Sequence, residues 1–134
     1  NGSLSYVKGD ENETYGPMPS ISPIFGTIGV EYAKDKIKIS ALYKFSGDKS
    51  PKDYSLGGED GLEETPVITE NSNGIIYAGT PKWSDFSIYT NYDISEDVKI
   101  RIALTNIFDN HYRTFASGIS APGRSFQIGL YLKL

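Results

Sequence analysis

The chain of 134 residues contains no cysteine, so a disulfide framework and a thiolate metal site are both excluded. No apolar run approaches the roughly 20 residues that a membrane-spanning helix requires. The net charge of −4 argues mildly against nucleic acid as a partner. The sequence also lacks a phosphate loop, a Gly-x-Ser-x-Gly turn and a His-Glu-x-x-His helix. We therefore expect neither an enzyme nor a resident cofactor.

What the chain does have is repeated alternation of apolar and polar residues. Near its C-terminal end, one side of an extended strand carries Phe126, Ile128, Leu130, Leu132 and Leu134. Six such segments can be drawn, at residues 2–8, 24–32, 37–45, 84–94, 98–108 and 124–134. No segment shows sustained helical spacing of its apolar residues. The sequence therefore predicts an all-β fold of antiparallel up-and-down strands with almost no helix.

The length and chemistry of these segments favour a lipid-facing wall over a soluble sandwich. Complete segments span roughly 9–11 residues, which suits a tilted strand that crosses a bilayer. Apart from the end residues Lys8 and Arg124, no charged residue falls on the apolar side of any segment. Lys or Arg at the lipid midplane would cost about 2–4 kcal/mol. The opposite sides carry the charges Glu31, Lys38, Lys44, Asp85, Asp93, Lys99, Arg101 and Lys133.

Connection lengths and aromatic positions give the same indication. The connections at 33–36 and 95–97 are short, whereas those at 9–23, 47–83 and 109–123 are long, which is typical of an outer-membrane barrel. Aromatic rings near both ends of the segments fit the two membrane interfaces, with Tyr32 and Tyr92 at one rim and Tyr43 and Phe45 at the other. Six strands are too few to close, so we expect the C-terminal part of a larger barrel or closure by several copies.

The long connections hold the candidate binding residues. Aromatic rings with a polar atom bind flat or sugar-like ligands at low entropic cost, and the candidates are Tyr15, Tyr54, Tyr77, Trp83, His111 and Tyr112. The only histidine, His111, has no partners at metal-ligand spacing, and we predict neither a catalytic set nor a metal site. An acidic cluster lacks the spacing of a calcium loop, and we interpret it as solvated; it contains Glu59, Asp60, Glu63 and Glu64.

A more specific pattern lies in the last thirty residues. The sequence Asn106-Ile-Phe-Asp109 is followed by Tyr112 and then by Pro122-Gly-Arg-x-Phe126 before the last alternating segment. This pattern resembles the C-terminal signature of TonB-dependent outer-membrane receptors. The segments at 17–23 and 79–83 resemble the same family where its strands begin. One departure is that family members commonly end in Phe, whereas this chain ends in Leu134.

The resemblance implies that residues 1–134 are the last six strands of a barrel of about 22 strands, plugged by an N-terminal domain. It implies the outer membrane of a Gram-negative bacterium and uptake of a ferric siderophore, haem, cobalamin or glycan. Implied partners are the rest of the barrel, the plug, lipid and, through the plug, the TonB complex. The residues that match the motif have structural roles: Asn106, Phe108, Asp109, Tyr112, Pro122, Gly123 and Arg124. The alternative is a soluble all-β module that binds a ligand such as a carbohydrate.

Overall fold

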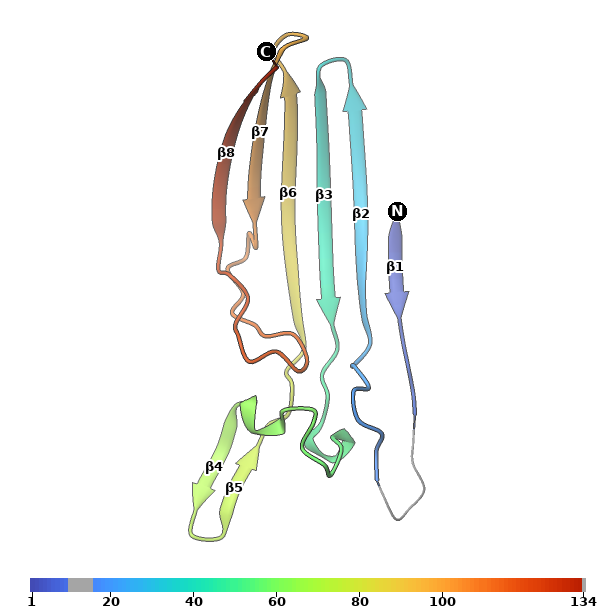
Figure 1. Cartoon of the computed structure of the whole chain (residues 1–134), viewed down its shortest axis with the longest axis vertical. Helices are drawn as coiled ribbons and strands as arrows, with labels where there is room; N and C mark the ends of the chain where they lie inside the picture. The colour runs from blue at the N-terminus through green and yellow to red at the C-terminus, as the bar shows by residue number, and fades with distance from the viewer. Residues whose placement is uncertain (10–15, 134) are drawn as a thin grey trace.

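Six antiparallel strands form one sheet in the computed structural model, which describes residues 1–9 and 16–133. The strands are β1 (Gly2–Ser5), β2 (Phe25–Lys34), β3 (Ile37–Ser46), β6 (Trp83–Asp93), β7 (Val98–Thr105) and β8 (Ser125–Leu132). Their order is β1-β2-β3-β6-β7-β8, so each strand lies beside the sheet strand that precedes or follows it in the chain (Figure 1). The predicted all-β, up-and-down antiparallel fold is confirmed.

Strand register gathers the alternating apolar residues into continuous rows. Val30 pairs with Ala41, Ala41 with Ile88, Ile88 with Leu104, and Leu104 with Phe126. Because successive side chains point to opposite sides of a strand, this row and the rows beside it make one apolar face. That face is uncovered: Val30 is 67% exposed and Phe126 is 65% exposed.

One charged residue does reach the apolar face. The strand β2 runs past its predicted end at residue 32, which places Lys34 on that face opposite Ile37. The expectation that the apolar face carries no charge is therefore wrong at this position. Lys34 is the last residue of β2 before the short turn, where its long stem can carry the ammonium group into water.

The opposite face is polar and linked across strands. The ammonium group of Lys38 lies 2.9 Å from the carboxylate of Glu31, and that of Lys99 lies 3.0 Å from the carboxylate of Asp93. The guanidinium of Arg101 sits over the ring of Tyr131 at 4.4 Å. These ion pairs are half exposed and screened by solvent, so they contribute little to stability. The face is thus a polar surface that carries charges of both signs.

Short and long connections lie at opposite ends of the sheet (Figure 1). The two short turns, at 35–36 and 94–97, are together at one end. The described parts of the long connections, at 6–9 with 16–24, at 47–82 and at 106–124, are together at the other end, and we call them the first, second and third outer loops. Among the described residues, β1 pairs only with β2 and β8 only with β7, so this sheet has two open edges. No described helix is long and apolar enough to cross a membrane.

Several boundaries differ from those predicted. The first strand ends at Ser5 rather than residue 8, and β7 ends at Thr105 because Asn106 adopts a left-handed backbone with φ of +47°. The second outer loop contains ordered structure that was not predicted: the 3₁₀ turns η1 (Pro51–Asp53) and η2 (Leu62–Glu64) and the hairpin of β4 (Val67–Asn71) and β5 (Gly74–Tyr77). Leu134, predicted on the apolar row, lies outside the described residues.

The buried residues of the described chain lie in the outer loops and at the strand ends next to them. Tyr54, which follows η1, is 3% exposed and is the one buried hydrophobic residue among those described. The sheet is a single layer, and neither of its faces is covered by another layer (Figure 1). The apolar residues of the strands therefore gain little burial from the rest of this chain.

Candidate functional site

Polar side chains at the outer end of β6 begin a network that holds the third outer loop. Asp85 and Ser87 are 7% and 1% exposed, and the hydroxyl of Ser87 donates to Asp85 Oδ1 at 2.7 Å. Tyr112 donates its hydroxyl to Asp85 Oδ2 at 3.0 Å. The backbone N–H of Asn106 donates to Ser87 Oγ at 3.2 Å. The carboxylate of Asp85 therefore joins β6 to the loop that follows β7.

Asn106 is the centre of that loop. Its side chain is almost fully buried, and Nδ2 donates to the carbonyl oxygens of Asn110 at 2.9 Å and Pro122 at 3.0 Å. Its Oδ1 accepts the N–H of Asn110 at 3.0 Å. Asn tolerates the left-handed backbone better than other residues with a side chain. Asn106 thus ends β7, and its side chain forms hydrogen bonds with three backbone groups, the most distant of them sixteen positions away in the sequence.

Asp109 fixes the start of the last strand. Its Oδ1 accepts the N–H of Arg124 at 2.7 Å, and its Oδ2 lies 3.9 Å from the Arg124 guanidinium. A Cβ at Gly123 would stand 3.0 Å from that carboxylate, which leaves room only for glycine without a local shift. Phe108 stacks on Phe86 of the apolar face at 6.0 Å. The residues of the motif therefore contact one another or the adjoining strands.

Tyr112 also packs against the first residue of β6. Its ring stacks on Trp83 with centroids 4.2 Å apart and planes 16° apart. Burial, together with the hydrogen bond to the Asp85 carboxylate, raises the pKa of Tyr112 to about 12. The phenol is therefore neutral at physiological pH and serves as a donor.

A second network ties all three outer loops together. Lys49 and Asp60 form an ion pair at 2.8 Å, with side chains 5% and 2% exposed. From the first outer loop, the N–H of Ser20 donates to Asp60 at 2.6 Å and the carbonyl of Ile21 accepts from Lys49 at 2.8 Å. From the third, the Phe115 ring lies 4.2 Å below the Lys49 ammonium. The outer loops are thus joined through one buried charge pair.

The interpretation of Asp60 as a solvated loop residue is wrong. Burial raises the pKa of Asp60, but the hydrogen bonds from Lys49, Ser20 and Ser55 outweigh burial and hold the pKa below its ordinary value. Next to it, the Tyr54 hydroxyl is hydrogen-bonded to Thr80 Oγ1 at 2.5 Å. The acidic residue is therefore a charged structural partner inside the loops.

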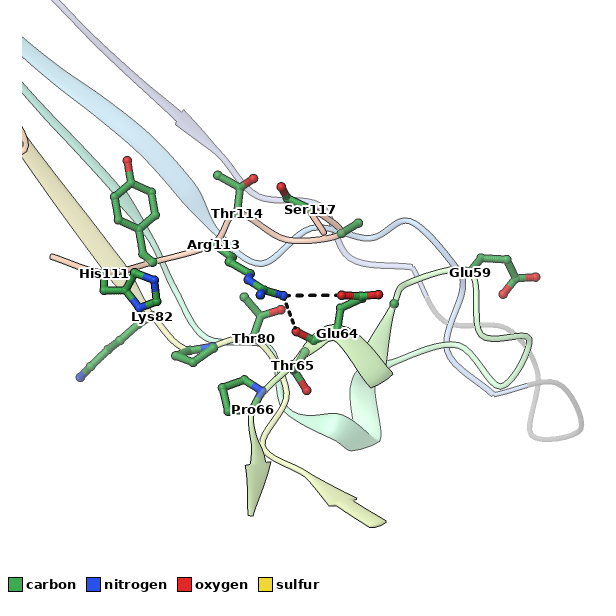
Figure 2. A pocket seen from close by; sticks show the side chains of 14 residues that line it. Glu59, Glu64, Thr65, Pro66, Thr80, Lys82, His111, Arg113, Thr114 and Ser117 are labelled. Atoms are coloured by element: carbon green, nitrogen blue, oxygen red, sulfur yellow. Dashed lines mark hydrogen bonds and ion pairs between the residues drawn. The ribbon is translucent and has the colours of Figure 1, made fainter. Parts of the chain in front are cut away.

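A pocket of about 380 Å³ opens between the second and third outer loops (Figure 2). This volume suits a small organic ligand. One wall comes from the chain around η2 and from residues 80–82, directly before β6, and the other from residues 111–117. Its charged side chains are Lys82, Arg113, Glu59 and Glu64. Arg113 points at Glu64, whereas Glu59 stands apart (Figure 2).

The six predicted ligand-binding residues are dispersed over the outer loops. His111 and Tyr112 line the pocket, and Trp83 adjoins it through its stacking on Tyr112. Tyr54 lies inside the loops with its hydroxyl bonded to Thr80. Tyr77 is on the β4–β5 hairpin, and Tyr15 lies outside the described residues. The structure thus groups three of the six around one pocket, and their role in binding stays a prediction.

Sequence reasoning missed the charged residues of this pocket. Arg113 and Glu64 are 49 positions apart, and nothing in their spacing indicates that they meet. Arg113 follows Tyr112 directly, so its position beside the motif was the one available signal. In the described part of the chain, no group of three or more His, Cys, Asp or Glu lies close enough to hold a metal ion.

The arrangement of the sheet defines the structural class. An open sheet in which strands consecutive in sequence are neighbours in space is how strands are arranged in the wall of an up-and-down β-barrel. Among solved structures, the chain is similar to the copper transporter OprC, with a TM-score of 0.69 and 19% sequence identity. The match covers 98% of this chain and 19% of that chain, so this chain spans a small part of that transporter's length. At this identity, the likeness shows a shared fold.

No family model matches the chain, and a search of curated proteins finds no match. The motif in residues 106–126 is therefore the feature of the chain that points to a family.

Proposed function

We propose that residues 1–134 form six adjacent strands in the wall of a larger transmembrane β-barrel. We further propose that this barrel is an outer-membrane receptor of the TonB-dependent class, which takes up a scarce nutrient. The observation that carries the proposal is the uncovered apolar face of the sheet. Ile28 of β2, Ile128 of β8 and Leu130 of β8 are 55%, 67% and 62% exposed, at the centres of strands rather than at their ends.

Such a face requires an apolar solvent or a covering layer. On soluble monomers, contiguous apolar patches rarely exceed a few hundred Å², and here the rows cross five strands. A sandwich would need a second sheet over this face. The second sheet of the described residues is the β4–β5 hairpin, which projects beyond the outer end of the main sheet (Figure 1). Lipid is the covering that remains consistent with strands of 10 to 11 residues.

Placing the sheet in lipid also implies further strands. Unpaired backbone groups in hydrocarbon cost several kcal/mol each, so a spanning sheet must close. The free edges of β1 and β8 would pair with the rest of the barrel wall. The polar face, with its charges of both signs, would then line a lumen that a plug domain fills.

The receptor function comes from the motif and the outer loops. The contacts of Asn106, Asp109 and Tyr112 give physical roles to the residues that resemble the TonB-dependent signature. The joined outer loops form a stable rim with a pocket at the extracellular side. The cargo we propose is a small nutrient, such as a ferric siderophore, haem, cobalamin or glycan, and copper is the cargo named for the similar transporter. Energy would come from the TonB complex through the plug.

Lipid contact can be tested on adjacent residues of β8. The full protein containing this chain would carry a spin label at Ile128→Cys or at Gln127→Cys, which lie on opposite faces. In liposomes, the label at 128 should be accessible to oxygen and protected from a water-soluble nickel chelate. The label at 127 should show the reverse or be protected from both. If label 128 is accessible to the chelate, or the protein is monomeric without detergent, the receptor proposal fails and the soluble module is favoured.

A further inference from the structure

Arg113 is the pocket residue whose side chain keeps hydrogen-bond donors free for a ligand. Its Nη1 donates to the backbone carbonyl of Glu64 at 3.0 Å and lies 3.5 Å from the Glu64 carboxylate, and its Nε donates to Ser120 Oγ at 3.4 Å. A guanidinium has five N–H donors, and the described residues give the two on Nη2 no partner. Its side chain is 43% exposed and faces the pocket (Figure 2).

The present partner of Arg113 is held weakly. The Glu64 side chain is 56% exposed, and its closest carboxylate oxygen is beyond normal hydrogen-bond length. Such an exposed pair contributes little to stability. A ligand that presents two oxygens in one plane would match the guanidinium fork better than this single long contact does. The carboxylate of Glu64 is therefore placed as an exchangeable counter-ion.

The remaining pocket charges favour an anion over a cation. Lys82 lines the same pocket, points away from Arg113 in Figure 2, and has no ion-pair partner among the described residues. The carboxylate of Glu59 is turned toward Ser55, whose hydroxyl donates to it at 2.6 Å. The formal charges of the pocket lining sum to zero, but Glu59 stands apart from Arg113 whereas Lys82 makes no ion pair with a described residue, so Lys82 is the charged group left open to an anion. Pro66, Pro81 and Ala116 supply apolar wall for the rest of a small molecule.

We propose that this pocket binds a small molecule through a carboxylate or phosphate group, which takes the Arg113 guanidinium in place of Glu64. The inference rests on the proposed function, since it assigns a ligand chemistry to the extracellular side of the receptor. Arg113 is the specificity-determining residue, and Glu64 is its competitor. Removing the competitor should therefore strengthen ligand binding, which a purely structural ion pair would not do.

Calorimetric titration of the full protein in detergent at low chloride tests this, with citrate and inorganic phosphate as separate probes. Citrate binding alone indicates a carboxylate ligand, and phosphate binding alone indicates a phosphate ligand. Arg113→Gln should weaken binding about tenfold or more, because a charge-assisted contact is lost. Glu64→Gln should tighten binding by up to about fivefold, and Arg113→Lys should fall between parent and Arg113→Gln.

The matched control is Lys52→Gln, which removes one positive charge from the same outer loops at a residue that does not line the pocket. It should leave binding unchanged. The inference is overturned if neither probe binds the parent at up to about 10 mM, if Glu64→Gln fails to tighten binding, or if Lys52→Gln weakens it as much as Arg113→Gln. Spin labels at Ile128 and Gln127 in the same preparation report lipid contact independently, so failure here is distinguishable from failure of the receptor proposal.

Discussion

Replacing Asn106 should open the third outer loop while leaving the sheet intact. Asn106→Ala removes three hydrogen bonds, to Asn110 N, Asn110 O and Pro122 O, from a residue that is 2% exposed. Each such bond contributes about 1 kcal/mol. The Ala side chain at a φ of +47° adds a cost of about 1 kcal/mol. The loop should therefore lose about 3–4 kcal/mol of resistance to local opening.

Arg113 supplies the assay, because trypsin cleaves after it once the loop opens. Cleavage tracks the open population when opening is fast relative to proteolysis. A loss of about 3 kcal/mol then predicts cleavage about 100-fold faster. Asn106→Gly loses the same bonds without the backbone strain, so its cleavage should be about fivefold slower than that of Asn106→Ala.

The control is Asn91→Ala, an amide on the polar face of β6 that makes no side-chain hydrogen bond among the described residues. It should be cleaved at the parent rate. The reasoning is refuted if Asn106→Ala is cleaved no faster than the parent protein, or if Asn91→Ala is cleaved equally fast.

Four further predictions concern other parts of the structure. Folding raises the pKa of Tyr112 from 10.0 to about 12, so the contribution of the neutral phenol to loop stability is full below pH 10 and is lost as the pH rises toward 12. Absorbance at 295 nm should show the ionisation of this tyrosine near pH 12, and Tyr112→Phe should abolish that step. Asp60→Asn leaves Lys49 buried without a charge partner, so the loops should lose about 3–5 kcal/mol of stability and be cleaved correspondingly faster. Adding Lys49→Met should recover part of that stability. Because the pKa of Asp60 lies below 3.8, the Lys49–Asp60 ion pair should persist at pH 5 and weaken only as the pH falls through that lowered pKa. The rate of loop cleavage by an acid protease, measured as a function of pH, checks this. Ile128→Arg places a charge in lipid at a cost of about 2–4 kcal/mol and should reduce the folded fraction in liposomes, whereas Gln127→Arg should leave that fraction unchanged. A gel that separates folded from heat-unfolded protein measures the fraction.

Strand positions were predictable because they depend on local alternation. The segment predicted at 37–45 corresponds to β3 (Ile37–Ser46), and the one at 84–94 corresponds to β6 (Trp83–Asp93). Each strand segment shows polar–apolar alternation with period two in its own sequence, so the strand can be located without tertiary information. Strand ends were less accurate, because Asn106 stops β7 through a backbone conformation that its side-chain bonds maintain.

The β4–β5 hairpin was missed although its turn was visible. Asn73-Gly74 lies between two short segments rich in β-branched residues, and Asn-Gly between such segments is a strong hairpin signal. The surrounding density of glycine and proline favoured a loop instead. The hairpin strands have only 5 and 4 residues, too few to show a clear period.

The loop interior and the pocket could not be predicted from the sequence alone. Lys49 and Asp60 carry opposite charges at a spacing that fits no regular element, and Ser20 joins them from 40 positions before Asp60. Arg113 and Glu64 meet only because the second and third outer loops converge at one end of the sheet (Figure 1). Such contacts depend on the tertiary arrangement of loops, which local patterns do not encode.

Fluorescence quenching by brominated lipid tests the central claim most directly. Tryptophan would replace Val30 on the apolar face or Ser40 on the polar face. Val30 pairs with Ala41, and Ser40 pairs with Glu31, the residue next to Val30, so the two sites lie at similar depth along the strands. After subtraction of the parent signal, bromines near the bilayer centre should quench Val30→Trp strongly and Ser40→Trp weakly. Equal quenching at both sites, or none at Val30→Trp, would contradict a wall whose apolar face is solvated by lipid.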